Sequence, residues 1–86
     1  MNDSQRKIVD GIISLVEGLL EEAMATSEFC EGADDFGESV VNGLLTEAHG
    51  LIELTQTNYY HIFFPNEKYH DLTEKYESTK YRLTQK

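Results

Sequence analysis

Apolar residues recur at steps of three and four positions along the first third of the chain. At about 100° per residue they occupy one broad stripe of a helix, and most acidic residues fall on the opposite side. Such a stripe is typical of a helix that packs on a core. The apolar positions are Ile8, Ile12, Leu15, Val16, Leu19, Leu20 and Ala23. The pattern predicts a first helix over about 5–29.

The same pattern returns further along the chain. Residues 9–21 and 41–53 align without a gap at an offset of about 32 positions, a spacing typical of a helix–turn–helix unit. Each copy carries a pair of glycines at the edge of its stripe, Gly11 and Gly18 in the first and Gly43 and Gly50 in the second. A glycine costs about 1 kcal/mol of helix propensity relative to alanine. Either a neighbouring backbone approaches closely at these positions, or both helices are locally weak.

A second helix is expected to begin at about 35, because Asp35 and Glu38 have the spacing of a capping box. Its apolar stripe continues through the aromatic run before Pro65, and the residue before a proline disfavours helix. We therefore predict a helix over about 35–63. The alternative is a short strand over 58–64, where β propensity is high, but a lone strand would have no partner in a helical chain.

The third helix is predicted over about 66–84, with Asn66 as its N-cap. Asp71 and Lys75 have the spacing of a favourable i,i+4 pair. The stripe of this helix consists of Tyr69, Leu72, Tyr76, Thr79 and Leu83. Because it contains few aliphatic residues, we expect it to be the least stable of the three helices.

These elements predict one all-α domain over 1–86. Short turns between long helices favour a small three-helix antiparallel bundle, in which the first two helices form a pseudo-repeat hairpin. A thin third helix leaves apolar surface on the first two that a second copy of the chain could cover. A homodimer is therefore a candidate assembly.

Acidic residues dominate the first two-thirds of the chain. The net charge is −9, and no Lys or Arg occurs between Lys7 and Lys68. Direct binding to nucleic acid or to anionic lipid is disfavoured, because phosphate contacts need clustered Lys or Arg. The expected partner is a basic protein surface.

Cysteine usage and hydropathy bear on the compartment. Cys30 is the single cysteine, which excludes an internal disulfide and fits a reducing environment. No apolar run approaches the roughly 20 residues of a membrane span, and no secretory signal is recognisable. A soluble cytoplasmic protein is expected.

The acidic face of the first helix is the main candidate binding surface. Its charges are spaced on a scale that resembles a phosphate backbone, and they would speed association with a basic site by electrostatic steering. The ordinary interpretation is a solvated helix face, but such faces usually interleave both signs of charge. The predicted acidic contacts are Asp10, Glu17, Glu21 and Glu28 on this helix, with Glu31, Asp34 and Asp35 in the turn that follows it.

The aromatic run 59–64 is the second candidate. Tyrosine is enriched at interface hot spots, so Tyr59 and Tyr60 are predicted as anchors for a partner. The alternative is that this run caps the end of the core.

No catalytic residue, metal site or cofactor is predicted. Glu67 and His70 have the Glu-x-x-His spacing of di-iron bundles, but the second motif that such a site needs is missing. The chain has no Cys-x-x-Cys, and nothing in its spacing gives Cys30 an activating base.

The sequence therefore favours a non-enzymatic acidic binding protein. We expect it to inhibit a nuclease or nucleic-acid-binding protein by occupying its basic surface as a DNA mimic. A phage-type anti-restriction or anti-CRISPR factor, or a nuclease immunity protein, would act in this way. The alternative is a helical dimerisation or regulatory subunit of a larger complex. A second alternative is a metal-dependent nucleotide hydrolase that uses Glu21, Glu22 and Glu53.

Overall fold

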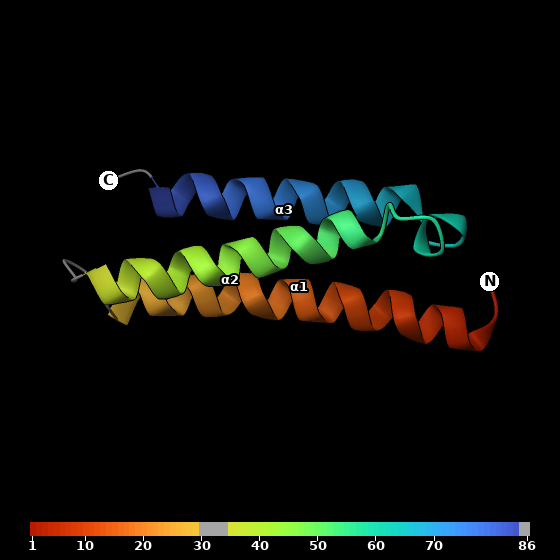
Figure 1. Cartoon of the computed structure of the whole chain (residues 1–86), viewed down its shortest axis with the longest axis horizontal. Helices are drawn as coiled ribbons and strands as arrows, with labels where there is room; N and C mark the ends of the chain where they lie inside the picture. Colours follow the sequence, from red (N-terminus) through yellow and green to blue (C-terminus); the bar gives the residue numbers. More distant parts are fainter. Residues whose placement is uncertain (30–34, 85–86) are drawn as a thin grey trace.

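Three long helices form the structure. The computed structural model describes residues 1–29 and 35–84, and within them the helices lie side by side with alternating direction and no strand (Figure 1). The elements in chain order are α1 (Asp3–Phe29), α2 (Asp35–Leu54), a short 3-10 helix η1 (Tyr60–Ile62) and α3 (Asn66–Thr84). The prediction of an all-α, antiparallel three-helix bundle is confirmed.

The first helix begins slightly earlier than predicted because a capping box precedes it. The backbone N–H of Gln5 donates to Oδ1 of Asn2 at 2.8 Å, and the backbone N–H of Asn2 donates to Oε1 of Gln5 at 3.1 Å. Reciprocal bonds of this kind satisfy N–H groups that a helix N-terminus leaves without an intrahelical partner. Asn2 thus sets the start of α1.

The core is the seam between α1 and α2. Val16 and Ala23 of α1 and Ala48 of α2 are completely buried. The other buried apolar residues of this seam are Val9, Ile12, Leu20, Leu45 and Ile52, and Phe64 joins them from the segment before α3. Leu72 is the one buried residue in the described part of α3. Since a buried aliphatic side chain contributes about 1.5–3 kcal/mol, burial holds α3 less firmly than it holds the hairpin.

The predicted extension of the second helix to about 63 is wrong, because α2 ends at Leu54. The backbone N–H groups of Thr55 and Thr57 donate to the carbonyls three residues back, at 3.2 and 3.1 Å. Their hydroxyls donate to the carbonyls of Ile52 and Leu54, at 2.6 and 2.7 Å. Threonine hydroxyls thus occupy carbonyls that would otherwise accept the next helical bonds. The tightened 3-10 turn stops the helix.

The alternative strand over 58–64 is also wrong. Within this segment Tyr60–Ile62 is a 3-10 helix, and the segment folds back so that Phe64 enters the core with only 4 % of its surface exposed. Nine further residues of helix would have projected about 13 Å beyond the end of α2. The early end of α2 therefore lets α3 return along the hairpin.

The four glycines of the internal repeat face open space. A Cβ placed on Gly11, Gly18, Gly43 or Gly50 would meet nothing within 4 Å. Of the two alternatives, close approach of a neighbouring backbone is thus excluded within one chain at these positions, which leaves locally weak helices. Within one chain these glycines cost helix propensity without a compensating contact.

This openness makes the substitution Gly18→Ala a test of the helix. We expect it to raise the free energy of unfolding by about 0.5–1 kcal/mol, because alanine has the higher helix propensity and its methyl group meets no neighbour. Urea denaturation at low protein concentration measures the change. Ala48→Gly is the matched control at a buried position and should lower stability. A loss of stability in Gly18→Ala would contradict the open geometry.

Candidate functional site

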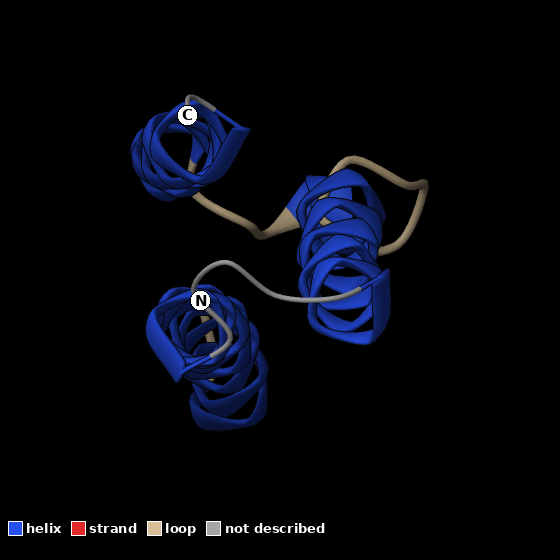
Figure 2. Cartoon of the chain, turned by 90° about the vertical axis from the view of Figure 1, so that its left-hand side faces the viewer, coloured by secondary structure: helices blue, strands red, loops and turns tan. Residues whose placement is uncertain are grey.

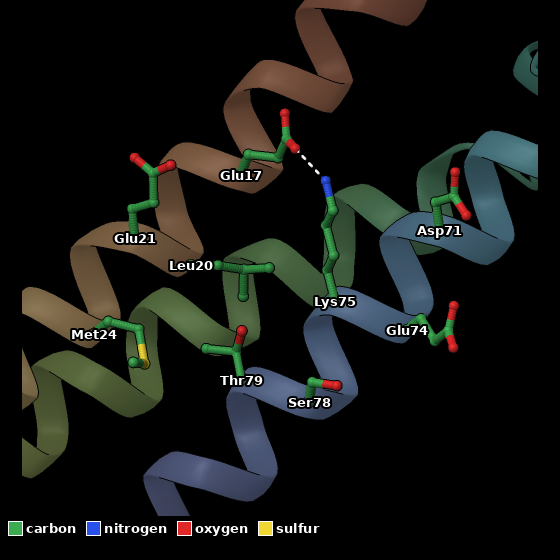
Figure 3. A pocket seen from close by; sticks show the side chains of 9 residues that line it. All are labelled: Glu17, Leu20, Glu21, Met24, Asp71, Glu74, Lys75, Ser78 and Thr79. Carbon is green, nitrogen blue, oxygen red and sulfur yellow. Dashed lines mark hydrogen bonds and ion pairs between the residues drawn. The ribbon is translucent and has the colours of Figure 1, made fainter.

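A groove of about 500 Å³ runs between α1 and α3 (Figure 3). Helix α1 contributes one wall, and α3 contributes the other, with α2 behind the groove. From α1 come Glu17, Leu20, Glu21 and Met24, and from α3 come Asp71, Glu74, Lys75, Ser78 and Thr79.

The groove exists because α3 has small side chains where it passes the second half of α1. The three helices occupy the corners of a triangle in the end-on view (Figure 2). Leu72 is the residue of α3 that reaches the core, and one turn or more further on the residues toward α1 are Ser78 and Thr79. These short hydroxyl residues do not fill the space above Leu20 and Met24, so the groove stays open.

The lining combines an apolar floor with an acidic rim. Leu20 is buried and Met24 is half-buried, whereas Glu21, Asp71 and Glu74 are exposed. Four carboxylates and one ammonium group line the groove, which leaves an excess of negative charge. This is the complement of an amphipathic helix that has lysine or arginine beside its apolar face.

Lys75 spans the groove and forms a hydrogen-bonded ion pair with the carboxylate of Glu17 (Figure 3). The hydrogen bond to Glu17 is the main cause that raises the pKa of Lys75 above its usual 10.5, and the charges of Glu17 and Asp71 raise it further. The two side chains remain 38 % and 54 % exposed, for Glu17 and Lys75 respectively. Exposed pairs of this kind contribute about 0–1 kcal/mol. The pair links α3 to α1 and neutralises one of the four groove carboxylates.

The structure brings only part of the predicted acidic face to this groove. Glu17 and Glu21 line it, whereas Asp10 and Glu28 are exposed on α1 and do not. The predicted contacts in the turn, Glu31 and Asp34, lie outside the described residues, as does the side chain of Asp35, the first residue of α2.

The two predicted aromatic anchors lie in the segment before α3 and do not line the groove. Tyr59 is 58 % exposed, and its ring meets the rings of Tyr60 and Phe63 edge-on, with centroids 5.3 and 5.4 Å apart. Tyr60 and Phe63 are half-buried against the core. Capping of the core, which was the alternative interpretation, therefore describes Tyr60 and Phe63, while Tyr59 remains available at the surface.

Asp71 and Glu74 of α3 were missed as site residues. The spacing of Asp71 and Lys75 predicted a pair within α3, but the ammonium group of Lys75 forms its ion pair with Glu17 instead. A carboxylate at 71, another at 74 and a serine at 78 follow helical spacing, and this is the sequence signal of a polar face turned toward α1. Which neighbour that face meets depends on the packing of α3.

No metal site is found in the described part of the chain. Within residues 1–29 and 35–84, no three side chains of His, Cys, Asp or Glu lie close enough together to hold an ion. His49 stacks on Tyr76 at a centroid distance of 5.2 Å and pairs with Glu53 at 3.2 Å. His61 and His70 are exposed. Over the same residues, no helix has both the length and the apolar content for a membrane crossing.

Comparison of the chain with protein-family models, with curated proteins and with solved structures finds no match. The case for function therefore depends on the geometry and charge of the chain itself.

The ion pair across the groove predicts a pH-dependent contribution to stability. The folded-state pKa of Lys75 is raised, so the pair contributes fully below pH 10.5 and is lost as the pH rises through the raised value. We expect Lys75→Gln to lower the free energy of unfolding by at most about 1 kcal/mol at neutral pH. At a pH above the raised pKa, the variant and the wild type should be equally stable. Urea denaturation at the two pH values measures both differences.

Glu17→Gln supplies the control for this pair. In the Lys75→Gln background, removal of the Glu17 charge should cost almost nothing further, because its partner is already gone. Two independent, additive losses would show that the ion pair does not form in solution.

Proposed function

We propose that this chain acts by binding another protein, and that the groove between α1 and α3 receives a basic segment of that partner. The observation that carries the proposal is the combination of an apolar floor, Leu20 and Met24, with carboxylates from two different helices. A solvated helix face has charge but no floor. A groove that has both can bury the apolar side of a partner helix while its lysines or arginines meet the rim.

The charge of the whole chain supports the same partner. With a net charge of −9 and no basic residue between Lys7 and Lys68, the anionic field extends well beyond the groove. Such a field accelerates encounter with a basic surface and repels nucleic acid. Proteins that bind nucleic acid have clustered lysine and arginine for phosphate contacts. A nuclease or another nucleic-acid-binding protein is therefore the class of partner that we propose.

Occupation of such a surface would make this chain an inhibitor. Along α1, Asp10, Glu17, Glu21 and Glu28 rise by roughly 10, 6 and 10 Å from one to the next at 1.5 Å per residue. These carboxylates would compete with DNA phosphates for the same basic side chains. An anti-restriction or anti-CRISPR factor of phage type, or an immunity protein against a nuclease, fits this mode of action.

The nucleotide hydrolase is less well supported. It needs Glu21, Glu22 and Glu53 to converge on a metal ion. Glu21 lines the groove and its neighbour Glu22 does not, while Glu53 pairs with His49 on α2.

A synthetic amphipathic helical peptide of lysine and leucine tests the groove. A scrambled peptide of the same composition is its control. We expect the amphipathic peptide to bind more tightly, because only it presents apolar and basic side chains on adjacent faces. Fluorescence anisotropy measures both affinities. We expect Glu21→Lys to weaken binding of the amphipathic peptide by about tenfold, since it replaces an attraction with a repulsion.

Glu22→Lys is the matched control, because it makes the same charge change one position away, at a residue that does not line the groove. It should weaken binding much less than Glu21→Lys. Equal losses in the two variants, or equal affinity for the two peptides, would show only non-specific attraction between opposite charges. Affinity should also fall between about 50 and 500 mM salt, since exposed charges are screened within ~10 Å at 0.1 M.

Thr79→Leu separates the shape of the groove from its charge. Leucine has the bulk to fill the space over Leu20 and Met24 while the net charge of the chain stays the same. We expect this variant to bind the amphipathic peptide at least about threefold more weakly and to be no less stable than the wild type. Unchanged peptide affinity, measured by the same anisotropy titration, would remove the groove from the proposal and leave only the charged surface.

A further inference from the structure

Three of the basic residues of α3 share one side of the helix. Lys68, Lys75 and Arg82 follow one another at seven-residue steps, and seven residues turn a helix to within about 20° of its starting direction. We call these three side chains the basic face of α3. Because Lys75 forms its ion pair with Glu17, this face is turned toward α1 (Figure 3).

The acidic face of α1 is turned toward α3 in the same way. Asp10 lies seven residues before Glu17 and Glu28 lies eleven residues after it, and both steps return a helix to within about 20°. Glu21 lies about 40° further round. Since Glu17 meets Lys75, the whole acidic face lies along the side of α1 on which α3 packs.

The two faces are in register. Helices α1 and α3 run in the same direction, because each is antiparallel to α2 (Figure 1). The ion pair joins Glu17 to Lys75 across a separation of 58 residues. At the same separation Asp10 is level with Lys68, since both lie seven residues before the pair. An acidic row and a basic row with the same seven-residue step thus run side by side.

Beyond Lys75 the match between the two faces is incomplete. Arg82 is level with Met24, so the nearest members of the acidic face, Glu21 and Glu28, lie about 4.5 Å before and about 6 Å after it along the axis. Within residues 1–29 and 35–84, the pair of Lys75 with Glu17 is the only ion pair that joins two helices. Glu21 stays exposed on the rim of the groove.

We infer that the basic face of α3 is an internal ligand of the acidic face of α1, and that a basic partner enters the groove by displacing the ammonium group of Lys75 from Glu17. The inference rests on the proposed function, because it states how binding to that groove is regulated. The charge of α3 takes the place of the partner's charge in the free protein, and Glu21 is the carboxylate at which the exchange begins.

This exchange requires side chains to move, whereas α3 itself stays in place. Leu72, Tyr76 and Leu83 keep the helix on the core. The side chains of Glu17 and Lys75 are 38 % and 54 % exposed, so an incoming cation reaches them from solvent without opening the bundle. Removal of Lys75 should therefore strengthen binding of a basic partner.

The amphipathic peptide of lysine and leucine tests the displacement. Fluorescence anisotropy titrations at about 150 mM salt measure its affinity, under conditions in which exposed charges more than ~8 Å apart are largely screened. We expect Lys75→Gln to bind the peptide about three- to fivefold more tightly than the wild type, because Glu17 then has no internal partner. If Lys75 served only to hold α3 in place, its loss would weaken binding or leave it unchanged.

Lys80→Gln is the matched control, because it removes the same charge from the same helix. Lys80 is five residues, or about 140° of rotation, from Lys75, and its ammonium group lies over the ring of Tyr76, 5.9 Å from the centroid. This variant should change the affinity by less than about 1.5-fold. In a Glu17→Gln background, Lys75→Gln should also lose its effect, since the displacement requires the carboxylate of Glu17.

The outcomes separate this inference from the proposed function. Equal gains in Lys75→Gln and Lys80→Gln, a gain that persists without Glu17, or a loss of affinity in Lys75→Gln overturns the inference and leaves the proposed function in place. If neither the wild type nor any variant binds the peptide, the proposed function fails and the inference fails with it. Circular dichroism establishes that each variant keeps its helices, as a change at an exposed ion pair should allow.

Discussion

The close contact between the apolar stripes of α1 and α2 is the interaction on which the rest of the structure depends. Val16 and Ala23 on one helix and Ala48 on the other are completely buried in the seam, and this fixes the rotation of each helix about its own axis. Once that rotation is fixed, Glu17 and Glu21 are on the side where α3 packs, and Leu15 is on the other. The position of the groove thus follows from how α1 and α2 pack against each other.

Helix α3 is attached to the hairpin by fewer buried side chains than join α1 to α2. Leu72 and the preceding Phe64 are its buried anchors, and the half-buried Tyr69, Tyr76 and Leu83 pack against the core. The ion pair between Lys75 and Glu17 adds one polar contact. Beyond Lys75, α3 has serine and threonine toward α1, so its contact with α1 is incomplete there, although Tyr76 and Leu83 still pack on the core. A third helix with leucine at these positions would pack more completely against α1, and the groove would be filled. The composition that makes α3 a poor core element is what leaves the groove open.

Periodicity predicted most of the fold, because a continuous apolar stripe leaves few alternatives for a helix. It failed at the end of α2, where the stripe continues through the aromatic run and the backbone does not. There the hydroxyls of Thr55 and Thr57 compete for the last carbonyls, a local effect that an average over many positions does not register. It failed again for Leu15, which belongs to the stripe by spacing but lies outside the seam. A broad stripe can serve two surfaces, and only packing shows where one ends.

The site was predictable to the extent that it lies on one helix. Of the residues that line the groove, Glu17 and Glu21 were predicted from the acidic face of α1. Asp71 and Glu74 were not, because they meet that face only through the tertiary position of α3. The same limit explains why the ion pair of Lys75 was not predicted. Its neighbour within the helix is Asp71, but it forms its ion pair with Glu17 of α1. Spacing along one helix identifies residues that can pair within that helix. It does not show whether such a residue instead contacts a residue of another helix.

If the groove binds a basic partner as we propose, the Lys75–Glu17 pair has a consequence for selectivity. Lys75 occupies the place that a lysine of a basic partner would take, so the chain contains its own competitor for Glu17. An incoming lysine would exchange one ammonium contact for an equivalent one and gain little. An arginine could displace Lys75 more favourably, because its planar guanidinium binds a carboxylate through two parallel hydrogen bonds. The intramolecular lysine would thus act as a threshold that favours arginine-rich surfaces over those that are merely cationic.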